Sequence, residues 1–150
     1  MDWQTFFIYL MACLVAASTG SLFPPSEWYR SLKKPLWNPP DWLFPIAWSI
    51  LYIIIAFAGM RISLIGTAES SFALALWALQ ISLNTIWTPV FFGLRKIRLA
   101  MGFMVGLWAT VLFMVLSYWY IDVVASALLI PYFLWVSFAA VLNYKILILN

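Results

Sequence analysis

Five long runs of hydrophobic residues, separated by short polar breaks, make up most of this chain. Each run has about twenty residues or more, enough for a helix to cross a hydrocarbon core of ~30 Å. The runs lack the alternation of apolar and polar positions that marks the strands of a membrane barrel. The pattern therefore predicts five transmembrane helices, at about residues 3–23, 43–65, 71–93, 99–120 and 123–149.

The connections between these runs indicate one all-α domain covering residues 1–150. Three of the connections are short and favour antiparallel neighbours in one bundle, whereas residues 24–42 form a long loop between the first and second helices. The first run follows Asp2 rather than a basic segment and is too long for the apolar core of a signal peptide, so we expect it to remain in the mature protein.

Composition supports an integral membrane protein. Hydrophobic residues make up 66% of the chain and charged residues 9%, and the mean hydropathy is +1.00; soluble domains have about a quarter charged residues. The sequence has no histidine and one cysteine, Cys13, so it lacks the commonest metal ligand and cannot form a disulfide within the chain. We find no catalytic triad, metal site or phosphate-binding loop, and we expect no nucleic-acid partner.

The basic residues predict an orientation, because cytoplasmic loops are enriched in Lys and Arg. One side of the predicted bundle would hold seven of them: Arg30, Lys33, Lys34, Arg95, Lys96, Arg98 and Lys145. The other side would hold Arg61 with three acidic residues, Asp2, Glu69 and Asp122. We therefore expect the C-terminal end and residues 24–42 to face the cytoplasm.

Polar and aromatic side chains recur at helical spacing on three of the predicted helices. These stripes contain Trp48 and Tyr52 on the second helix; Trp77, Gln80, Asn84, Trp87 and Phe91 on the third; and Tyr132, Trp135, Ala139, Leu142 and Asn143 on the fifth. An amide that faces lipid finds no partner, so Gln80 and Asn84 should point inward, either to other helices or into a cavity. The many indoles favour a cavity for a flat, conjugated or sterol-like ligand.

Residues 24–42 combine stiffness, aromatic rings and positive charge. Five prolines restrict the backbone, three tryptophans provide amphipathic rings, and Arg30, Lys33 and Lys34 provide cations. One interpretation is a lid over the cytoplasmic mouth of the bundle, whose cations meet acidic groups of a ligand. The alternative is an anchor for lipid headgroups. We call residues 24–42 the lid loop.

Small residues at four-residue spacing allow close contact between helices in lipid. Ala12, Ala16 and Gly20 form one such ridge, and Gly102 and Gly106 form another. Either ridge could pack inside the bundle or form the seam of a homodimer. Pro89 should break the end of the third helix and free the carbonyl of Thr85.

Three segments resemble the translocator protein / tryptophan-rich sensory protein (TspO/MBR) family, as a bacterial-type member. They are "WYRSLKKPLWNPPDWLFPIAWSILY", "NTIWTPVFFG" and "PYFLWVSFAAVLN". The resemblance implies a five-helix bundle, often dimeric, that binds protoporphyrin-type tetrapyrroles as ligands rather than as covalent cofactors. In some members the ligands include cholesterol or benzodiazepine-site compounds. A bacterial envelope is the implied location.

The resemblance also implies a ligand pocket. Its positions correspond here to Trp28, Trp37, Asn38, Trp48, Asn84, Trp87, Trp135 and Ala139, and the stripes add Tyr52 and Phe91. Some bacterial members degrade protoporphyrin in light, which would assign a redox role to Trp48 and Trp135. The family's sterol motif requires a spacer between tyrosine and the next cation, and Tyr144 and Lys145 are adjacent, so we do not expect cholesterol binding.

Three functions follow as hypotheses. The first is a membrane receptor or regulatory protein that binds porphyrins and related hydrophobic molecules. The second is a light-dependent enzyme that degrades porphyrin. The third is a transporter, which is disfavoured because we find no charged residue near mid-membrane and no internal repeat.

Overall fold

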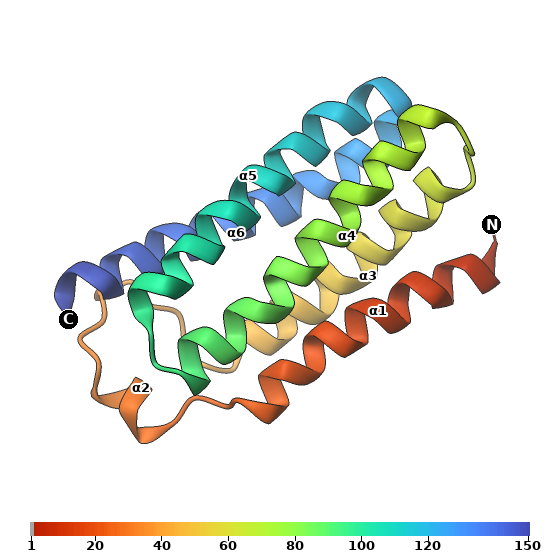
Figure 1. The fold of residues 1–150 in the computed structure, drawn as a ribbon. Coiled ribbons are helices and arrows are strands. Elements are labelled where there is room, and N and C mark those ends of the chain that lie inside the picture. The colour runs from red at the N-terminus through yellow and green to blue at the C-terminus, as the bar shows by residue number, and fades with distance from the viewer. Residues whose placement is uncertain (1) are drawn as a thin grey trace.

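The computed structural model describes residues 2–150, which form a helical bundle (Figure 1). The elements in chain order are α1 (Trp3–Leu22), α2 (Glu27–Ser31), α3 (Leu43–Ser63), α4 (Ala68–Thr88), the π-helical turn η1 (Pro89–Gly93), α5 (Ile97–Ile121) and α6 (Val123–Leu149). Five helices are long and apolar enough to cross a membrane, with α4 and η1 counted as one span. The predicted all-α fold with five spanning helices is confirmed.

The helices pack so that α3 and α4 occupy the middle of the bundle. Helix α1 contacts α3 and α4, α5 contacts α4 and α6, and α6 returns to contact α3 (Figure 1). The core between them is apolar and includes Cys13, Ile55, Val111 and Leu129, each fully buried. Many large apolar side chains, such as Phe113, remain exposed on the outside, as expected for a surface that faces lipid.

Gly59 of α3 lies against aromatic side chains of two other helices. A Cβ atom at this position would lie 2.7 Å from Cδ1 of Tyr9 in α1 and 2.8 Å from Nε1 of Trp77 in α4. The Trp77 indole donates a hydrogen bond to the Ile55 carbonyl at 3.0 Å and meets the Tyr9 ring edge-on at 4.8 Å. Glycine is therefore needed here for contact, because any larger side chain would push these rings apart.

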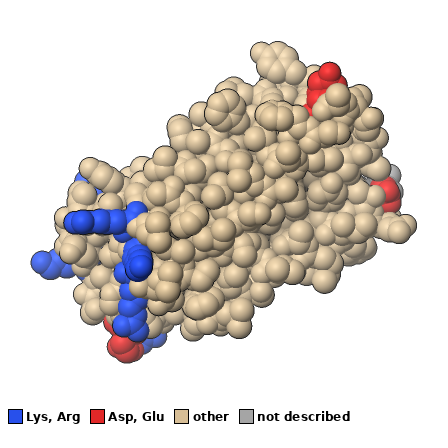
Figure 2. Space-filling model, viewed as in Figure 1, with Lys and Arg blue, Asp and Glu red and all other residues tan. Residues whose placement is uncertain are grey.

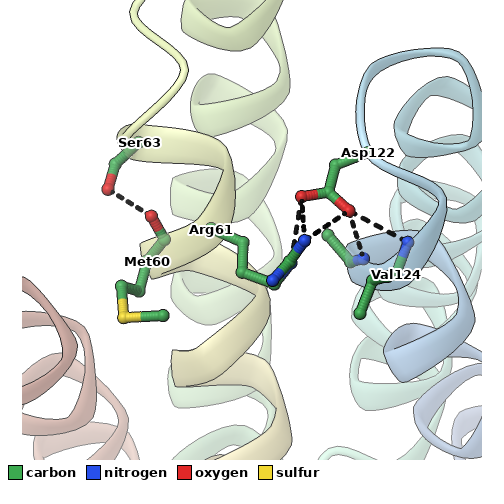
Figure 3. A network of polar contacts seen from close by, with 6 residues as sticks. Met60, Arg61, Ser63, Asp122 and Val124 are labelled. Atoms are coloured by element: carbon green, nitrogen blue, oxygen red, sulfur yellow. Dashed lines mark hydrogen bonds and ion pairs between the residues drawn. The ribbon is translucent and has the colours of Figure 1, made fainter. Parts of the chain in front are cut away.

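Polar side chains cap several helix ends. Asp2 accepts hydrogen bonds from the first turn of α1, and Thr67 and Ser70 form a reciprocal capping box at the start of α4. Asp122 caps α6 through Val124 N at 2.9 Å and also forms an ion pair with Arg61 of α3 (Figure 3). Two Arg61 nitrogens donate to this carboxylate, at 2.9 and 3.2 Å. The only basic residue predicted for that side of the bundle thus ties α3 to α6.

The small-residue ridge of α1 is divided between the inside and the outside of the bundle. Ala16 is buried in the core and Ala12 packs against it, which matches the packing interpretation. Gly20 is exposed, and a Cβ atom there would meet nothing within 4 Å. On α5, Gly102 is equally open, whereas a Cβ atom at Gly106 would lie 3.7 Å from Cδ1 of Leu83 in α4. A homodimer seam therefore stays a prediction.

Two local features differ from the expected outline. The lid loop contains the short helix α2 (Glu27–Ser31), and the chain continues beyond α4 as the π-helical turn η1. Pro89 ends α4 at Thr88, as expected, and is the first residue of η1. A proline lacks the N–H that continues an α-helix, and the wider turn accommodates this while keeping Val90 and Phe91 buried. Arg95 follows in a left-handed conformation with φ of 57°, so Lys96 N can donate to the Val90 carbonyl.

Candidate ligand-binding site

Inside the bundle, α3, α4 and α6 bring together a group that we call the amide cluster: Trp48, Tyr52, Gln80, Asn84 and Tyr132. Tyr132 Oη donates to Gln80 Oε1 at 2.7 Å, and Asn84 Nδ2 donates to Tyr52 Oη at 3.3 Å. The Trp48 ring lies 5.5 Å from that of Tyr52 and 6.3 Å from that of Tyr132. Both predicted inward-facing amides thus bond to tyrosines of neighbouring helices.

The amide cluster is not fully satisfied. Gln80 is completely buried, and its Nε2 atom has no hydrogen-bond partner among the described residues. A buried donor without a partner costs about 1–3 kcal/mol, so such groups are rare in folded proteins. Gln80 therefore offers an unused donor in the middle of the bundle.

A second group lies one helical turn from the amide cluster, towards the lid loop. This indole row consists of Trp37 of the lid loop, Phe44 of α3, and Trp135 and Phe138 of α6. The rings follow one another in the order Trp37, Phe138, Trp135 and Phe44, and the centres of neighbouring rings are 5.6–6.0 Å apart. The Trp135 Nε1 atom is buried and has no partner within residues 2–150. Trp37 is 45% exposed, so the outer end of the indole row reaches the surface.

The third group surrounds α2 and contains Trp28, Tyr29, Trp87, Phe91 and Phe92; we call it the α2 cluster. The rings of Trp87 and Phe91 stack at 5.1 Å, and Trp28 meets Phe91 edge-on at 5.8 Å. The Trp87 indole donates to Asn143 Oδ1 at 3.2 Å. The α2 cluster therefore fastens the lid loop to the end of the third span.

Polar contacts also hold the lid loop in place. Lys34 Nζ lies 4.4 Å from the centre of the Tyr29 ring, and the Asn150 side chain bonds to both backbone groups of Lys33 at 3.0 Å. Arg30 pairs only with Glu27, at 3.2 Å, and both side chains are largely exposed. Asn38 donates to the Pro39 carbonyl at 2.9 Å. Arg30 and Lys33 thus remain accessible at the mouth of the bundle, while Lys34 covers the α2 cluster.

Two surface hollows stand out, and neither includes a predicted ligand-binding residue. One has a volume of about 380 Å³ and lies between the start of α5 and the end of α6. The other, of about 420 Å³, lies between α1 and α4. The aromatic residues of the predicted pocket pack against one another in this structure. No three His, Cys, Asp or Glu side chains in residues 2–150 could together hold a metal ion.

Comparison with known proteins identifies the fold family. The family model described as "TspO/MBR family" matches residues 7–149. The chain belongs to the TspO/MBR family. It is 44% identical to "Protein CrtK" of Rhodobacter capsulatus, over 100% of this chain and 95% of that protein. It is 41% identical to "Tryptophan-rich sensory protein" of Cereibacter sphaeroides, over 100% of this chain and 94% of that protein.

The similarity extends to animal members of the TspO/MBR family. "Translocator protein" of Homo sapiens is 30% identical over 91% of this chain and 84% of that protein. The matched range contains the amide cluster, the indole row and the α2 cluster in full. Together with its five apolar helices, membership in the TspO/MBR family makes this chain an integral membrane protein.

The sequence led us to expect all the site residues in one pocket, whereas the structure places most of them in three groups and leaves Asn38 and Ala139 outside these groups. Trp48, Tyr52 and Asn84 lie in the amide cluster, Trp37 and Trp135 in the indole row, and Trp28, Trp87 and Phe91 in the α2 cluster. Ala139 is half-buried and packs against the main core.

Five aromatic residues of the three groups were not among the expected site residues: Tyr29, Phe44, Phe92, Tyr132 and Phe138. Phe44 precedes Trp48 by four positions and Phe138 follows Trp135 by three, so helical spacing could have found both. Tyr29 has only its position beside Trp28 as a signal. It is 5% exposed, and burial raises the pKa of its phenol, as does the nearby Asp41 carboxylate.

Proposed function

We propose that this TspO/MBR protein is a membrane receptor or regulatory protein that binds protoporphyrin-type tetrapyrroles between the amide cluster and the lid loop. The observation that carries the proposal concerns two buried donors set among aromatic rings, Gln80 Nε2 and Trp135 Nε1, which have no hydrogen-bond partner within residues 2–150. A flat, conjugated ligand with acceptor atoms would stack on the rings and accept from these donors.

The lid loop supplies complementary charge. Arg30 and Lys33 are exposed at the mouth, and a tetrapyrrole carries carboxylates that would pair with such cations. Because the rings of the indole row are in mutual contact, ligand entry requires them to separate. Trp37 would move most easily, since it is 45% exposed and belongs to the lid loop rather than to a spanning helix.

The test is quenching of tryptophan fluorescence by protoporphyrin IX, with the full chain in lipid nanodiscs. We expect saturable quenching, and Trp135→Phe should weaken binding by about tenfold, because one hydrogen bond of about 1–1.5 kcal/mol is lost. Trp119→Phe is the matched control, since this indole is 53% exposed on α5. Equal affinity of the Trp135→Phe variant and the wild type would contradict the proposed site.

The contacts of Trp48 support a second candidate function, light-dependent degradation of a bound porphyrin. The Trp48 ring adjoins two tyrosines, at 5.5 and 6.3 Å, and these rings could relay an electron to a photoexcited ligand. This function would be supported if light bleached the porphyrin absorption band with the wild-type protein but not with a Trp48→Phe/Trp135→Phe variant. Bleaching that persists in the double variant would exclude the redox role of these tryptophans.

We also propose an orientation and an oligomeric state. Lys and Arg side chains gather at the end of the molecule that holds the C-terminus and α2 (Figure 2), which supports a cytoplasmic location for that end. The hollow between α1 and α4 is lined by Ala12 and Thr85 among others and would accommodate a helix of a second copy. Ser82→Trp, which fills this hollow, should then shift the dimer towards monomer in analytical ultracentrifugation, whereas Ser71→Trp, exposed at the start of α4 and outside the hollow, should not.

A further inference from the structure

The surface hollow between the start of α5 and the end of α6 differs from the one between α1 and α4 because basic side chains line it. It lies where the turn after η1, the start of α5 and the end of α6 meet, and its volume is about 380 Å³. Three cations line it, Arg95, Lys96 and Arg98, together with the amide of Asn150. We call it the basic hollow. None of its lining residues belongs to the amide cluster, the indole row or the α2 cluster, and the Arg95 guanidinium lies 6.0 Å from the centre of the Trp28 ring of the α2 cluster.

The cations of the basic hollow have no acidic partners. Residues 2–150 contain two ion pairs, Arg30 with Glu27 and Arg61 with Asp122, and neither involves the basic hollow. Arg95, Lys96 and Arg98 are all exposed, and no side chain caps the start of α5 beside them. Three like charges held close together repel one another unless an anion joins them.

The walls of the basic hollow are apolar below the cations. Ile97, Leu99 and Leu147 complete its lining, and they belong to the first turn of α5 and the last turns of α6. These two helices are membrane spans, so the basic hollow lies at the depth where hydrocarbon gives way to headgroups. A ligand that fits both parts has an anionic head and an apolar tail.

We propose that the basic hollow is a binding site for the phosphate headgroup of an anionic phospholipid, with the acyl chains along α5 and α6. The charges would hold the phosphate by charge-assisted hydrogen bonds, and Leu99 and Leu147 would contact the start of the chains. The Asn150 side chain also bonds to Lys33 of the lid loop, so a bound lipid would adjoin the attachment of the lid loop.

The test measures lipid binding to the full chain in detergent by native mass spectrometry, with phosphatidylglycerol and phosphatidylcholine of identical acyl chains. The first variant, Arg95→Gln/Lys96→Gln/Arg98→Gln, should weaken phosphatidylglycerol binding by about 10- to 100-fold, given the usual contribution of a cation near a membrane surface. The control variant, Arg30→Gln/Lys33→Gln/Lys145→Gln, removes the same number of cations from the same end and should change affinity by less than about threefold.

A further variant separates lost binding from lost folding. Arg95 has a φ of 57°, a conformation that glycine adopts without strain, so Arg95→Gly should keep or raise the unfolding temperature while it weakens phosphatidylglycerol binding. Equal effects of the two triple variants would overturn the proposal, since the attraction would then be diffuse. So would equally tight phosphatidylcholine binding, or displacement of the lipid by an equal concentration of inorganic phosphate, which would indicate a site for free anions.

Discussion

The hydrogen bond between Tyr132 and Gln80 allows a quantitative test of the amide cluster. Both residues are fully buried, and Tyr132 Oη lies 2.7 Å from Gln80 Oε1. Tyr132→Phe removes one oxygen atom with little change in volume. The Gln80 amide, whose Nε2 already lacks a partner, would then be unpaired at both ends.

The loss of these hydrogen-bond partners gives an estimate of the change in the free energy of unfolding. An unpaired buried polar group costs about 1–3 kcal/mol, but hydrogen bonds between membrane helices average only about 0.6 kcal/mol, because the unfolded chain in lipid finds other partners. We therefore expect Tyr132→Phe to lower the free energy of unfolding by about 1–2 kcal/mol. Gln80→Met added to this variant removes the stranded amide, so the double variant should be more stable than the sum of the single changes predicts, by about 1 kcal/mol.

The assay is reversible unfolding in mixed micelles, followed by circular dichroism, for the four members of the cycle. Tyr52→Phe combined with Gln80→Met is the matched control, because Tyr52 bonds to Asn84 and not to Gln80. That pair should be additive to within about 0.5 kcal/mol. If the Tyr132 cycle is also additive, or if Tyr132→Phe does not reduce stability, the hydrogen bond has no energetic role and our reasoning about the amide cluster is wrong.

Three further predictions concern other parts of the bundle. Gly59→Ala should lower the free energy of unfolding by about 1–3 kcal/mol in the same assay, because its Cβ atom would overlap two aromatic rings. Gly102→Ala is the control and should leave the stability unchanged, because the space around Gly102 is open. Arg61→Met should lower the free energy of unfolding by about 1–2 kcal/mol, because it leaves the half-buried Asp122 carboxylate unpaired. Asp122→Asn should lower it less, because the asparagine still caps α6. A larger loss of stability in Asp122→Asn than in Arg61→Met would contradict this role of the ion pair. Burial raises the pKa of Tyr29, so the folded protein favours the neutral phenol. Tyr29 therefore contributes to the stability of the fold at pH values below tyrosine's ordinary pKa of 10.0, and this contribution is lost as the pH rises above it. The ultraviolet absorbance of tyrosinate should show one late-titrating tyrosine fewer in Tyr29→Phe than in the wild type.

The spanning helices could be predicted from the sequence because hydropathy is a local sum. Each run of about twenty apolar residues must become helical in a bilayer whatever its neighbours are, since its backbone groups have no other partners there. The segregation of Lys and Arg is likewise visible without a structure, and Figure 2 shows the basic residues together at one end. The resemblance of the tryptophan-rich segments to the TspO/MBR family added the expected pocket positions.

Other features depended on how the helices rotate against one another. Periodicity placed Gln80 and Asn84 on an inward face, but only packing decided that each pairs with a tyrosine and that one donor of Gln80 has no partner. In the same way, Ala16 became buried while Gly20, on the same ridge, remained exposed. A spacing of four residues defines a face, and the neighbouring helices decide how much of that face is covered.

The chain's sequence by itself determined the number of spans, the end that carries the positive charge and the types of residue in the proposed ligand site. Only the tertiary structure determined the three aromatic groups, the burial of Tyr29 against Phe91 and Phe92, and the basic hollow formed by residues 95–99 with residues 147 and 150. The physical reason is the range of the interactions. Transfer into a membrane is a property of one segment, whereas a site requires side chains from distant segments to meet, and packing of the whole bundle decides which ones do.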